Sequence, residues 1–272
     1  MTDSRTESPR AFDRLLSYVQ SELDFETGFY NDAYLDRRIT ARMRRTGADS
    51  YRAYQRQLAD DPDERAALLD SLSINVTGFF RNPEAWDRIG AVLRTVTDGP
   101  GRTRCWSVPC ADGREPYSLA MLALDDPEID DRRLEILGTD ISEAALAVAR
   151  EGRYETSQTT DIAAELSPLD DYSAYVDRDG DEFRVTDRVR EMVTFERHDL
   201  IRGEPKAGFD VVLCRNLLIY IDAEYKMPIF ETIEGSLRER GYLIIGMTET
   251  LPHECRGAFE PVDKRHRVYR RR

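Results

Sequence analysis

Hydrophobic positions in the first 74 residues follow the period of a helix. The first run places its apolar side chains on one face: Phe12, Leu15, Leu16, Val19 and Leu23. A second run, YLDRRITARMRR (34–45), repeats this spacing among five arginines. Asp61-Pro62 suits a helix cap and first turn, and a third helical run continues from there to Leu72. No strand pattern interrupts these runs, so the sequence predicts a small all-helical domain over residues 1–82.

The pattern changes after DGPGR (98–102), where short apolar runs alternate with helical ones. The predicted strands are CWSVP (105–109), LEILGTD (134–140), FDVVLCRN (209–216), YLIIGMTE (242–249) and, at the end, HRVYRRR (266–272). The predicted helices are EPYSLAMLAL (115–124), a segment from Ser142 to about Gly152, and a segment around 223–238. Strands that alternate with helices predict an α/β fold with a doubly wound, Rossmann-like sheet over residues 83–272.

One section breaks this alternation. Between Tyr154 and His198 the chain has short β-like runs on either side of a DGD turn (179–181). Such runs are typical of a hairpin and not of a crossover helix. We therefore predict a small β-subdomain, inserted into the sheet domain at about 155–197.

Composition and charge argue against two classes, nucleic-acid-binding proteins and membrane-spanning proteins. Of 272 residues, 40% are hydrophobic, which is enough for a substantial core, and 52 acidic residues outweigh 39 basic ones for a net charge of −13. The broad basic surface of a nucleic-acid-binding protein is therefore absent. No apolar run approaches the roughly 18 residues of a membrane span, and the N-terminus has no apolar signal core. We expect a cytoplasmic protein, monomeric and not inserted into a membrane.

Cysteine and histidine chemistry has little support in the sequence. The four cysteines form no C-x-x-C pair: Cys105, Cys110, Cys214 and Cys255. The three histidines are widely separated along the chain. A zinc or redox site is therefore not expected, and the cysteines are interpreted as buried free thiols.

Polar residues follow the predicted strands at the positions where a doubly wound sheet binds ligands. Asp140 ends the second strand, and an acid at that position accepts the two hydroxyls of a ribose. The loop CADGREPYS (110–118) contains only Gly113, which fits a dinucleotide poorly and leaves an adenosine cofactor without phosphates as the alternative. Glu115 either pairs with a cationic group of such a ligand or simply favours the positive end of its helix.

Several segments, in this order and at these intervals, resemble the chemotaxis receptor methyltransferases, the CheR family. They are INVTGFFRN (74–82), WSVPCADGREPYSLAM (106–121), LGTDIS (137–142) with AREGRY (149–154), FDVVLCRNLLIYID (209–222) and GYLIIGMTE (241–249). The resemblance runs through almost the whole chain. It implies a protein-glutamate O-methyltransferase that uses S-adenosyl-L-methionine, releases S-adenosyl-L-homocysteine and modifies glutamate side chains of chemoreceptors.

The resemblance also implies roles for individual residues. The cofactor and active site are reached by Asn75, Thr77 and Arg81. Glu115 contacts the methionine portion and Asp140 the ribose. The adenosine pocket is lined by Asp199, Leu200, Asn216 and Leu217. This chain departs from the family pattern at Asp199, where asparagine is usual, and at Arg114, which replaces a common acid.

Methyl transfer to a glutamate needs little acid–base equipment, because that carboxylate, with a pKa near 4.3, is already ionised at pH 7. The protein must still position the carboxylate against the methyl donor and remove part of its water. Arg81 and Tyr220 are the candidates for orienting the incoming carboxylate; the alternatives are a surface ion pair for Arg81 and core packing for Tyr220. The aromatic pair Phe79-Phe80 is interpreted as core, with packing at a domain junction as the alternative.

The second helical run suggests a surface for the substrate. It concentrates five arginines within nine residues of an acidic chain: Arg37, Arg38, Arg42, Arg44 and Arg45. Such a patch would attract the acidic cytoplasmic helices of a receptor, and the alternative is a solvated face neutralised by neighbouring acids. Whether the predicted β-subdomain binds a receptor tether stays open.

Three other functions compete with receptor methylation. One is an adenosylmethionine-dependent methyltransferase for another substrate, and another is a non-catalytic module that binds receptors. A nicotinamide oxidoreductase is the third, and it lacks the expected glycine fingerprint.

Overall fold

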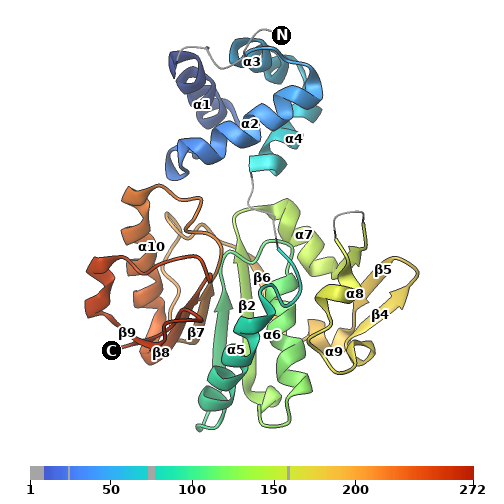
Figure 1. Cartoon of the computed structure of the whole chain (residues 1–272), viewed down its shortest axis with the longest axis vertical. Helices are drawn as coiled ribbons and strands as arrows, with labels where there is room; N and C mark the ends of the chain where they lie inside the picture. Colours follow the sequence, from blue (N-terminus) through green and yellow to red (C-terminus); the bar gives the residue numbers. More distant parts are fainter. Residues whose placement is uncertain (1–8, 24, 73–76, 158–159) are drawn as a thin grey trace. The chain divides into compact units, whose positions relative to one another are not determined.

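The computed structural model describes the chain except for residues 1–8, 24, 73–76 and 158–159 (Figure 1). It divides into two compact units. The helical unit comprises residues 1–75 together with 220–225, and the sheet unit comprises residues 76–219 and 226–272. Asn75 belongs to the stretch outside the described residues, so its expected role at the cofactor stays a prediction.

The helical unit is built from four α-helices and a short 3-10 helix among its described residues. These are α1 (Pro9–Leu23), the 3-10 helix Thr27–Phe29, α2 (Asp32–Thr46), α3 (Tyr51–Asp60) and α4 (Pro62–Leu72). The side chain of Asn31 caps α2 by accepting a hydrogen bond from the backbone N–H of Tyr34 at 2.9 Å, and Gly47 ends that helix in the left-handed conformation. The core between the helices is apolar, with Leu15, Val19, Leu35, Ile39 and Leu58 fully buried. The all-helical N-terminal region is confirmed.

A short segment from far along the chain completes the helical unit. The backbone N–H of Asn31 donates to the carbonyl of Tyr220 at 3.0 Å, and that of Asp222 donates to the carbonyl of Phe29 at 2.9 Å. The ring of Tyr220 also packs against that of Tyr34, with centroids 4.8 Å apart. The hydrophobic periodicity of the sequence could not predict that residues 220–225 join the helical unit, because backbone hydrogen bonds hold this segment there.

The sheet unit contains a seven-stranded sheet in the order β6-β2-β1-β7-β8-β10-β9 (Figure 1). The strands are β1 (Thr103–Ser107), β2 (Leu134–Asp140), β6 (Val193–Arg197), β7 (Phe209–Cys214), β8 (Leu237–Ile245), β9 (Phe259–Asp263) and β10 (Val268–Arg271). The first five in the spatial order pair in parallel, and β10 pairs antiparallel with both β8 and β9. The predicted doubly wound α/β fold is confirmed.

Helices precede and connect these strands. The longer ones are α5 (Pro83–Thr97), α6 (Arg114–Asp125), α7 (Glu143–Glu151) and α10 (Ala223–Ser236). Of these, α6, α7 and α10 have ends close to the predicted ones, whereas α5 was not predicted. Ser142 caps α7 by accepting a hydrogen bond from the backbone N–H of Ala145, and Gly152 ends the helix with φ 64°, as predicted. The first strand ends at Ser107, two residues earlier than predicted, and Pro109 has no N–H to donate to a neighbouring strand.

The inserted β-subdomain is a separate three-stranded sheet. Its strands β3 (Arg153–Glu155), β5 (Glu182–Val185) and β4 (Val176–Asp179) are antiparallel and lie in that order. Two short helices, α8 (Ile162–Glu165) and α9 (Asp187–Arg190), flank it. Residues 193–197, which the predicted insertion included, instead form β6 and pair with β2 at the edge of the main sheet.

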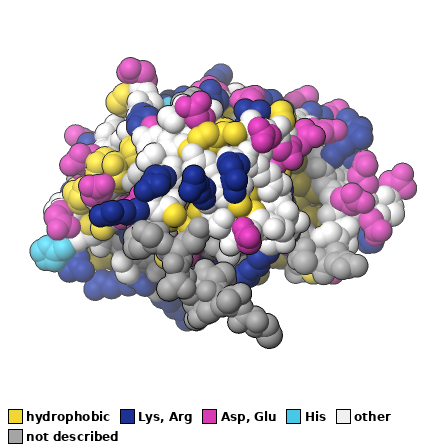
Figure 2. All heavy atoms as spheres, turned by 90° about the horizontal axis from the view of Figure 1, so that it is seen from above, with side chains coloured by type: hydrophobic (Ala, Val, Ile, Leu, Met, Phe, Trp, Pro, Cys, Tyr) yellow, Lys and Arg dark blue, Asp and Glu magenta, His cyan; other side chains and the backbone are white. Residues whose placement is uncertain are grey.

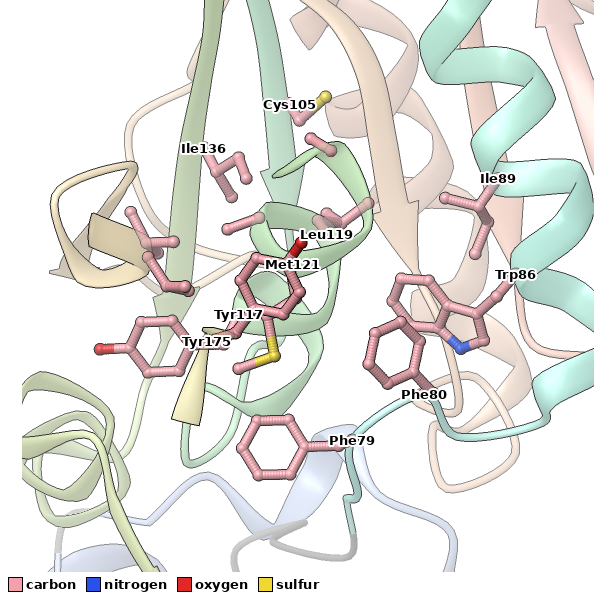
Figure 3. Packing of buried hydrophobic residues seen from close by; sticks show 14 of the residues in the cluster. Phe79, Phe80, Trp86, Ile89, Cys105, Tyr117, Leu119, Met121, Ile136 and Tyr175 are labelled. Atoms are coloured by element: carbon pink, nitrogen blue, oxygen red, sulfur yellow. The ribbon is translucent and has the colours of Figure 1, made fainter. Parts of the chain in front are cut away.

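The aromatic pair that follows the undescribed segment 73–76 belongs to the core of the sheet unit. Phe79 and Phe80 are 2% and 1% exposed. The Phe79 ring lies edge-on to Tyr154 and the Phe80 ring edge-on to Trp86, each with centroids 5.0 Å apart. Figure 3 shows both rings directed into the cluster that contains Tyr117. The interpretation of this pair as core is confirmed.

The remaining expectations from composition concern thiols, metals and membranes. All four cysteines are free and buried, as predicted, and burial raises the pKa of the Cys255 thiol to about 11. Among the described residues, no group of three or more His, Cys, Asp or Glu side chains is arranged to hold a metal ion. Of the described helices, none has both the length and the apolarity that crossing a bilayer requires.

Replacing Phe80 with alanine should destabilise the protein strongly. The change removes a ring from a packed cluster, and we expect the free energy of unfolding to fall by about 3–5 kcal/mol, measured by urea unfolding followed with circular dichroism. Val262→Ala is the control, because Val262 is 45% exposed and its truncation should cost less than about 0.5 kcal/mol. Equal losses in the two variants would contradict the core assignment of Phe80.

Candidate active site

Polar side chains gather where the parallel strands of the sheet unit end. Asp140 is the last residue of β2, Glu115 lies in the first turn of α6 after β1, and Asn216 follows β7. Asp199 follows β6 by two residues. Because parallel strands place their carboxyl ends at the same edge of a sheet, these four side chains share one edge, where doubly wound folds bind ligands.

The Asp140 carboxylate accepts hydrogen bonds from the loops that follow β1 and β2. One of its carboxylate oxygens accepts a hydrogen bond from the backbone N–H of Ala111 at 2.8 Å, and the other accepts one from Ser142 at 2.9 Å. The residue is only 6% exposed, and this burial raises the pKa of its carboxyl, while the backbone donors act in the opposite direction. A carboxylate offers about four acceptor positions, and the backbone N–H of Ile141 also contributes here, so capacity remains for a ribose hydroxyl.

Glu115 forms a buried ion pair that the sequence did not reveal. Its carboxylate accepts a hydrogen bond from the Ser107 hydroxyl at 2.8 Å and pairs with the guanidinium of Arg215 at 3.0 Å. The Arg215 side chain is 1% exposed. Glu115 thus has a third role besides the two considered from the sequence, and spacing offered no signal for it because 100 residues separate the partners.

Arg215 extends this pair to the segment that carries Arg81. Its Nη2 donates to the carbonyl of Arg81 at 2.7 Å and reaches Oδ1 of Asn82 at 3.5 Å. The guanidinium carbon also lies 5.6 Å from the centre of the Trp86 ring, and the indole N–H donates to the same Arg81 carbonyl at 3.1 Å. The backbone of Arg81 is thereby fixed beside Glu115, while its own side chain is half-buried.

The loop after β7 is held by an acid to which no role was assigned from the sequence. Glu249 is buried and accepts hydrogen bonds from the backbone N–H groups of Gly246, Asn216 and Leu218 at 2.6, 3.0 and 2.7 Å. Asn216 adopts φ 62°, and a Cβ at Gly246 would lie 2.9 Å from its backbone nitrogen. Glycine at 246 therefore permits the close approach that places Asn216 and Leu217 at the edge.

Asp199 shapes the loop after β6. Its Oδ1 accepts hydrogen bonds from the backbone N–H groups of Ile201 at 2.8 Å and Arg202 at 3.1 Å, and Leu200, which follows Asp199, is buried. Both bonds need only an acceptor oxygen, which the asparagine usual in the family also provides. The substitution thus preserves the turn. The neighbouring His198 packs edge-on against Trp106, and its Nε2 lies 3.0 Å from the carbonyl of Glu204.

A second network explains why a positive charge suits position 114. The Arg114 guanidinium pairs with Asp112 at 2.9 Å and with Glu165 of α8 at 3.1 Å. Glu165 in turn accepts a hydrogen bond from the backbone N–H of Phe79 at 2.9 Å. Arg114 therefore joins the inserted subdomain to the loop after β1, and a carboxylate in its place would face two others.

The structure divides the predicted site residues between its two units. The sheet unit holds Thr77, which is half-buried, together with Arg81, Glu115, Asp140, Asp199, Leu200, Asn216 and Leu217. Tyr220 and the five arginines of α2 belong to the helical unit. The pairing of Arg81 with Tyr220 around one substrate carboxylate stays a prediction.

The five arginines of α2 differ in their surroundings. Arg37, Arg44 and Arg45 are exposed. Arg38 is half-buried, with its guanidinium carbon 5.4 Å from the centre of the Tyr34 ring. Arg42 is 17% exposed and forms an ion pair with the buried Glu64, to which the Tyr54 hydroxyl also donates. Arg42 lies on the same helix face as Arg38 and Arg45, at i, i+4, i+7 spacing. That spacing alone did not show that Arg42 makes a structural contact instead of contributing to a binding surface.

Two parts of the chain match models of known protein families. Residues 10–73 match the family described as CheR methyltransferase, all-alpha domain, and residues 75–268 match CheR methyltransferase, SAM binding domain. A chemotaxis protein methyltransferase of Listeria monocytogenes is 34% identical over 239 residues, which covers 86% of this chain and 87% of the relative. A probable chemotaxis protein methyltransferase of Rhizobium etli is 33% identical over 236 residues, covering 83% and 87%.

Removing the charge of Arg215 should destabilise the sheet unit. Arg215→Met keeps much of the side-chain volume but leaves Glu115 without its partner, and we expect a loss of about 3–5 kcal/mol in the free energy of unfolding. Adding Glu115→Gln to this variant should recover most of that loss, because no charge is then left unpaired.

The control for this double-mutant cycle is Arg150→Met, which removes an exposed partner of Glu143. That change should cost less than about 1 kcal/mol in urea unfolding. A cost for Arg215→Met no larger than for Arg150→Met would show that the buried pair does not support the fold.

Proposed function

The chain belongs to the CheR methyltransferase family, and we propose that it methylates glutamate side chains of chemoreceptors. As a member of this family it is an S-adenosylmethionine-dependent methyltransferase of chemotaxis. The carboxylate acceptor and the residues that orient it form the proposal. The observation that carries it is the fixed position of Arg81, whose backbone is bound by a buried Arg215 beside Glu115.

The residues at the sheet edge fit the cofactor. S-adenosylmethionine, when bound, supplies the methyl group and a sulfonium leaving group. Asp140 accepts hydrogen bonds from backbone N–H groups, and as a carboxylate with about four acceptor positions it retains capacity for a ribose hydroxyl. The loops at Asp199 and Asn216 are each held by acceptor carboxylates, which suits a pocket for adenosine. Glu115 places a negative charge where the cationic methionine portion is expected, although Arg215 already offsets part of that charge.

Arg81 is proposed to orient the incoming glutamate. A guanidinium presents two parallel donors that match the two oxygens of a carboxylate. The acceptor is already ionised at neutral pH, so the protein needs to supply no general base. Tyr220 is proposed to donate one further hydrogen bond from its hydroxyl. These contacts should position the carboxylate without neutralising it fully, because a tighter hold on the ground state would slow the transfer.

The exposed arginines of α2 are proposed to attract the receptor. Arg37, Arg44 and Arg45 are the three of the five that are exposed, whereas Arg38 packs on Tyr34 and Arg42 is paired with Glu64. Figure 2 shows basic side chains lying side by side on the face that it displays. In a chain with a net charge of −13, such a concentration of positive charge favours encounter with the acidic cytoplasmic helices of a receptor.

Substituting the site residues should separate cofactor binding from transfer. We expect Asp140→Asn to weaken binding of S-adenosylhomocysteine by at least about tenfold, measured by calorimetry, because one ribose acceptor is replaced by a donor. Arg81→Ala should lower kcat/KM for transfer of radiolabelled methyl to receptor-bearing membranes by about 100-fold. The label should be alkali-labile, as expected of a carboxyl methyl ester.

Asp179→Asn is the control for these variants, because Asp179 is exposed on β4. Its cofactor affinity and activity should equal those of the unmodified protein. If the cofactor binds but no receptor acquires alkali-labile label, the proposed acceptor is wrong and another substrate or a binding role has to be sought.

Charge reversal on α2 should affect receptor recognition alone. The double variant Arg44→Glu and Arg45→Glu should raise KM for the receptor by about tenfold or more at low salt with little change in kcat, and the difference should shrink as salt screens it. The matched control is Arg52→Glu with Arg56→Glu, since both residues are exposed on α3 of the same unit. Equal effects of the two double variants would show that overall charge, and not this helix, governs recognition.

A further inference from the structure

A cavity of about 370 Å³ lies in the sheet unit, and none of the proposed active-site residues lines it. It is formed by residues 250–256, which precede β9, and by the hairpin of β9 and β10. The buried Leu251, Phe259 and Tyr269 line it together with Pro261. We call this cavity the hairpin groove.

The hairpin groove is lined by cations. Arg256, Lys264, Arg267 and Arg272 contribute to its walls, and no acidic residue does. Within the part of the chain that the structure describes, none of these four has an ion-pair partner, and Arg267 donates only to the carbonyl of Met247 at 3.2 Å. Four cations without an ion pair are unexpected in a chain with 52 acidic residues. The hydrogen bond and charge of Arg270 lower the pKa of Glu260, and the charge of Arg272 makes a smaller contribution to that shift.

Two basic groups of the same hairpin that do not line the groove are paired with acids, whereas Arg271 donates to the carbonyl of Leu237. Arg270 forms an ion pair with Glu260, and His266 contacts Asp263 at 2.9 Å. Acidic partners are thus present on this hairpin, but none of them lines the groove. A cavity lined by charges of one sign concentrates ligands of the opposite sign, because the field inside it is focused by the low-dielectric walls.

The cations stand at the two ends of the groove. Lys264 and Arg267 flank the turn between β9 and β10, whereas Arg272 follows β10. The backbone N–H of Arg272 donates to the carbonyl of Ala258 at 2.9 Å. Because Ala258 is two residues from Arg256, Arg272 and Arg256 belong to the same end of the groove. A strand advances about 3.3 Å per residue, so the five residues from Arg267 to Arg272 separate the two ends by about 16 Å.

We propose that the hairpin groove binds an extended acidic peptide segment of a protein partner. Carboxylates of the segment would pair with the cations at each end, and an apolar side chain between them would lie on Tyr269 and Pro261, which are directly paired across the two strands. A compact anion would reach only one end. A long nucleic acid is disfavoured by the net charge of −13.

The test uses the full chain and a labelled peptide, acetyl-EELFEE-amide, followed by fluorescence anisotropy. Its acids are separated by up to five residues, about 16 Å when extended. We expect the peptide to bind, with affinity that falls as salt rises, and its counterpart with glutamine in place of glutamate not to bind. Charge reversal at both ends, Arg256→Glu with Lys264→Glu, should raise Kd by at least about tenfold.

The matched control is Arg132→Glu with Arg265→Glu, which changes the net charge equally at exposed residues that do not line the groove. Its Kd should change by less than about threefold. Failure of the peptide to bind, or an equal loss in both double variants, would overturn the proposal. Displacement of the peptide by pyrophosphate at a lower concentration than by unlabelled peptide would assign the groove to a compact phosphate instead.

This inference is independent of the proposed methyl acceptor. Binding of S-adenosylhomocysteine should be unchanged in both double variants, which shows in the same samples that the sheet unit remains folded. Peptide binding can therefore fail while receptor methylation succeeds. Receptor methylation can likewise fail while the peptide binds, and the two assays tell these outcomes apart.

Discussion

One buried ion pair, between Arg215 and Glu115, holds together the loops at the edge of the sheet where the parallel strands end. A guanidinium that is almost fully excluded from water is tolerated only where carboxylate and carbonyl acceptors surround it. The terminal nitrogens of Arg215 find such acceptors in Glu115 from the start of α6 and the carbonyl of Arg81, while its buried Nε has no hydrogen-bond partner among the described residues. Three segments that are distant in the chain are thereby fixed to one another: residues 81–82, the helix after β1, and the end of β7. The proposed orienting residue, Arg81, takes its backbone position from this pair.

Carboxylates with backbone donors form the second structural theme of the sheet unit. Asp140, Glu249, Asp199 and Glu165 each accept hydrogen bonds from the N–H groups of loops. These contacts satisfy donors that a loop at a strand end would otherwise leave unpaired. The acidic residues of this chain are therefore more than a solvating surface. Several of them determine the loop shapes on which a cofactor pocket depends.

The basic residues divide into those that serve the fold and those left available. Arg42, Arg114 and Arg215 are paired with acids in buried or half-buried positions, where breaking the pair would expose a desolvated charge. Arg37, Arg44 and Arg45 on α2 are exposed, and the cations of the hairpin groove have no ion-pair partner among the described residues. Both proposed contacts with acidic partners rest on this second class, because a cation that is already paired has little charge to offer a ligand.

The local pattern of the sequence determined most of the elements. Strand β2 has the predicted ends, and α7 begins and ends at the predicted caps, because alternation, capping and glycine at a left-handed position act over a few residues. The placement of Asp140 at the end of its strand followed from the same pattern, whereas β1, β7 and β8 end two to four residues before the predicted ends. Only the tertiary structure decided the partner of Glu115, the roles of Glu249 and Arg42, and the addition of residues 220–225 to the helical unit. Those contacts join positions far apart in the chain, and hydrophobic periodicity carries no information about which distant charges or backbone groups will meet.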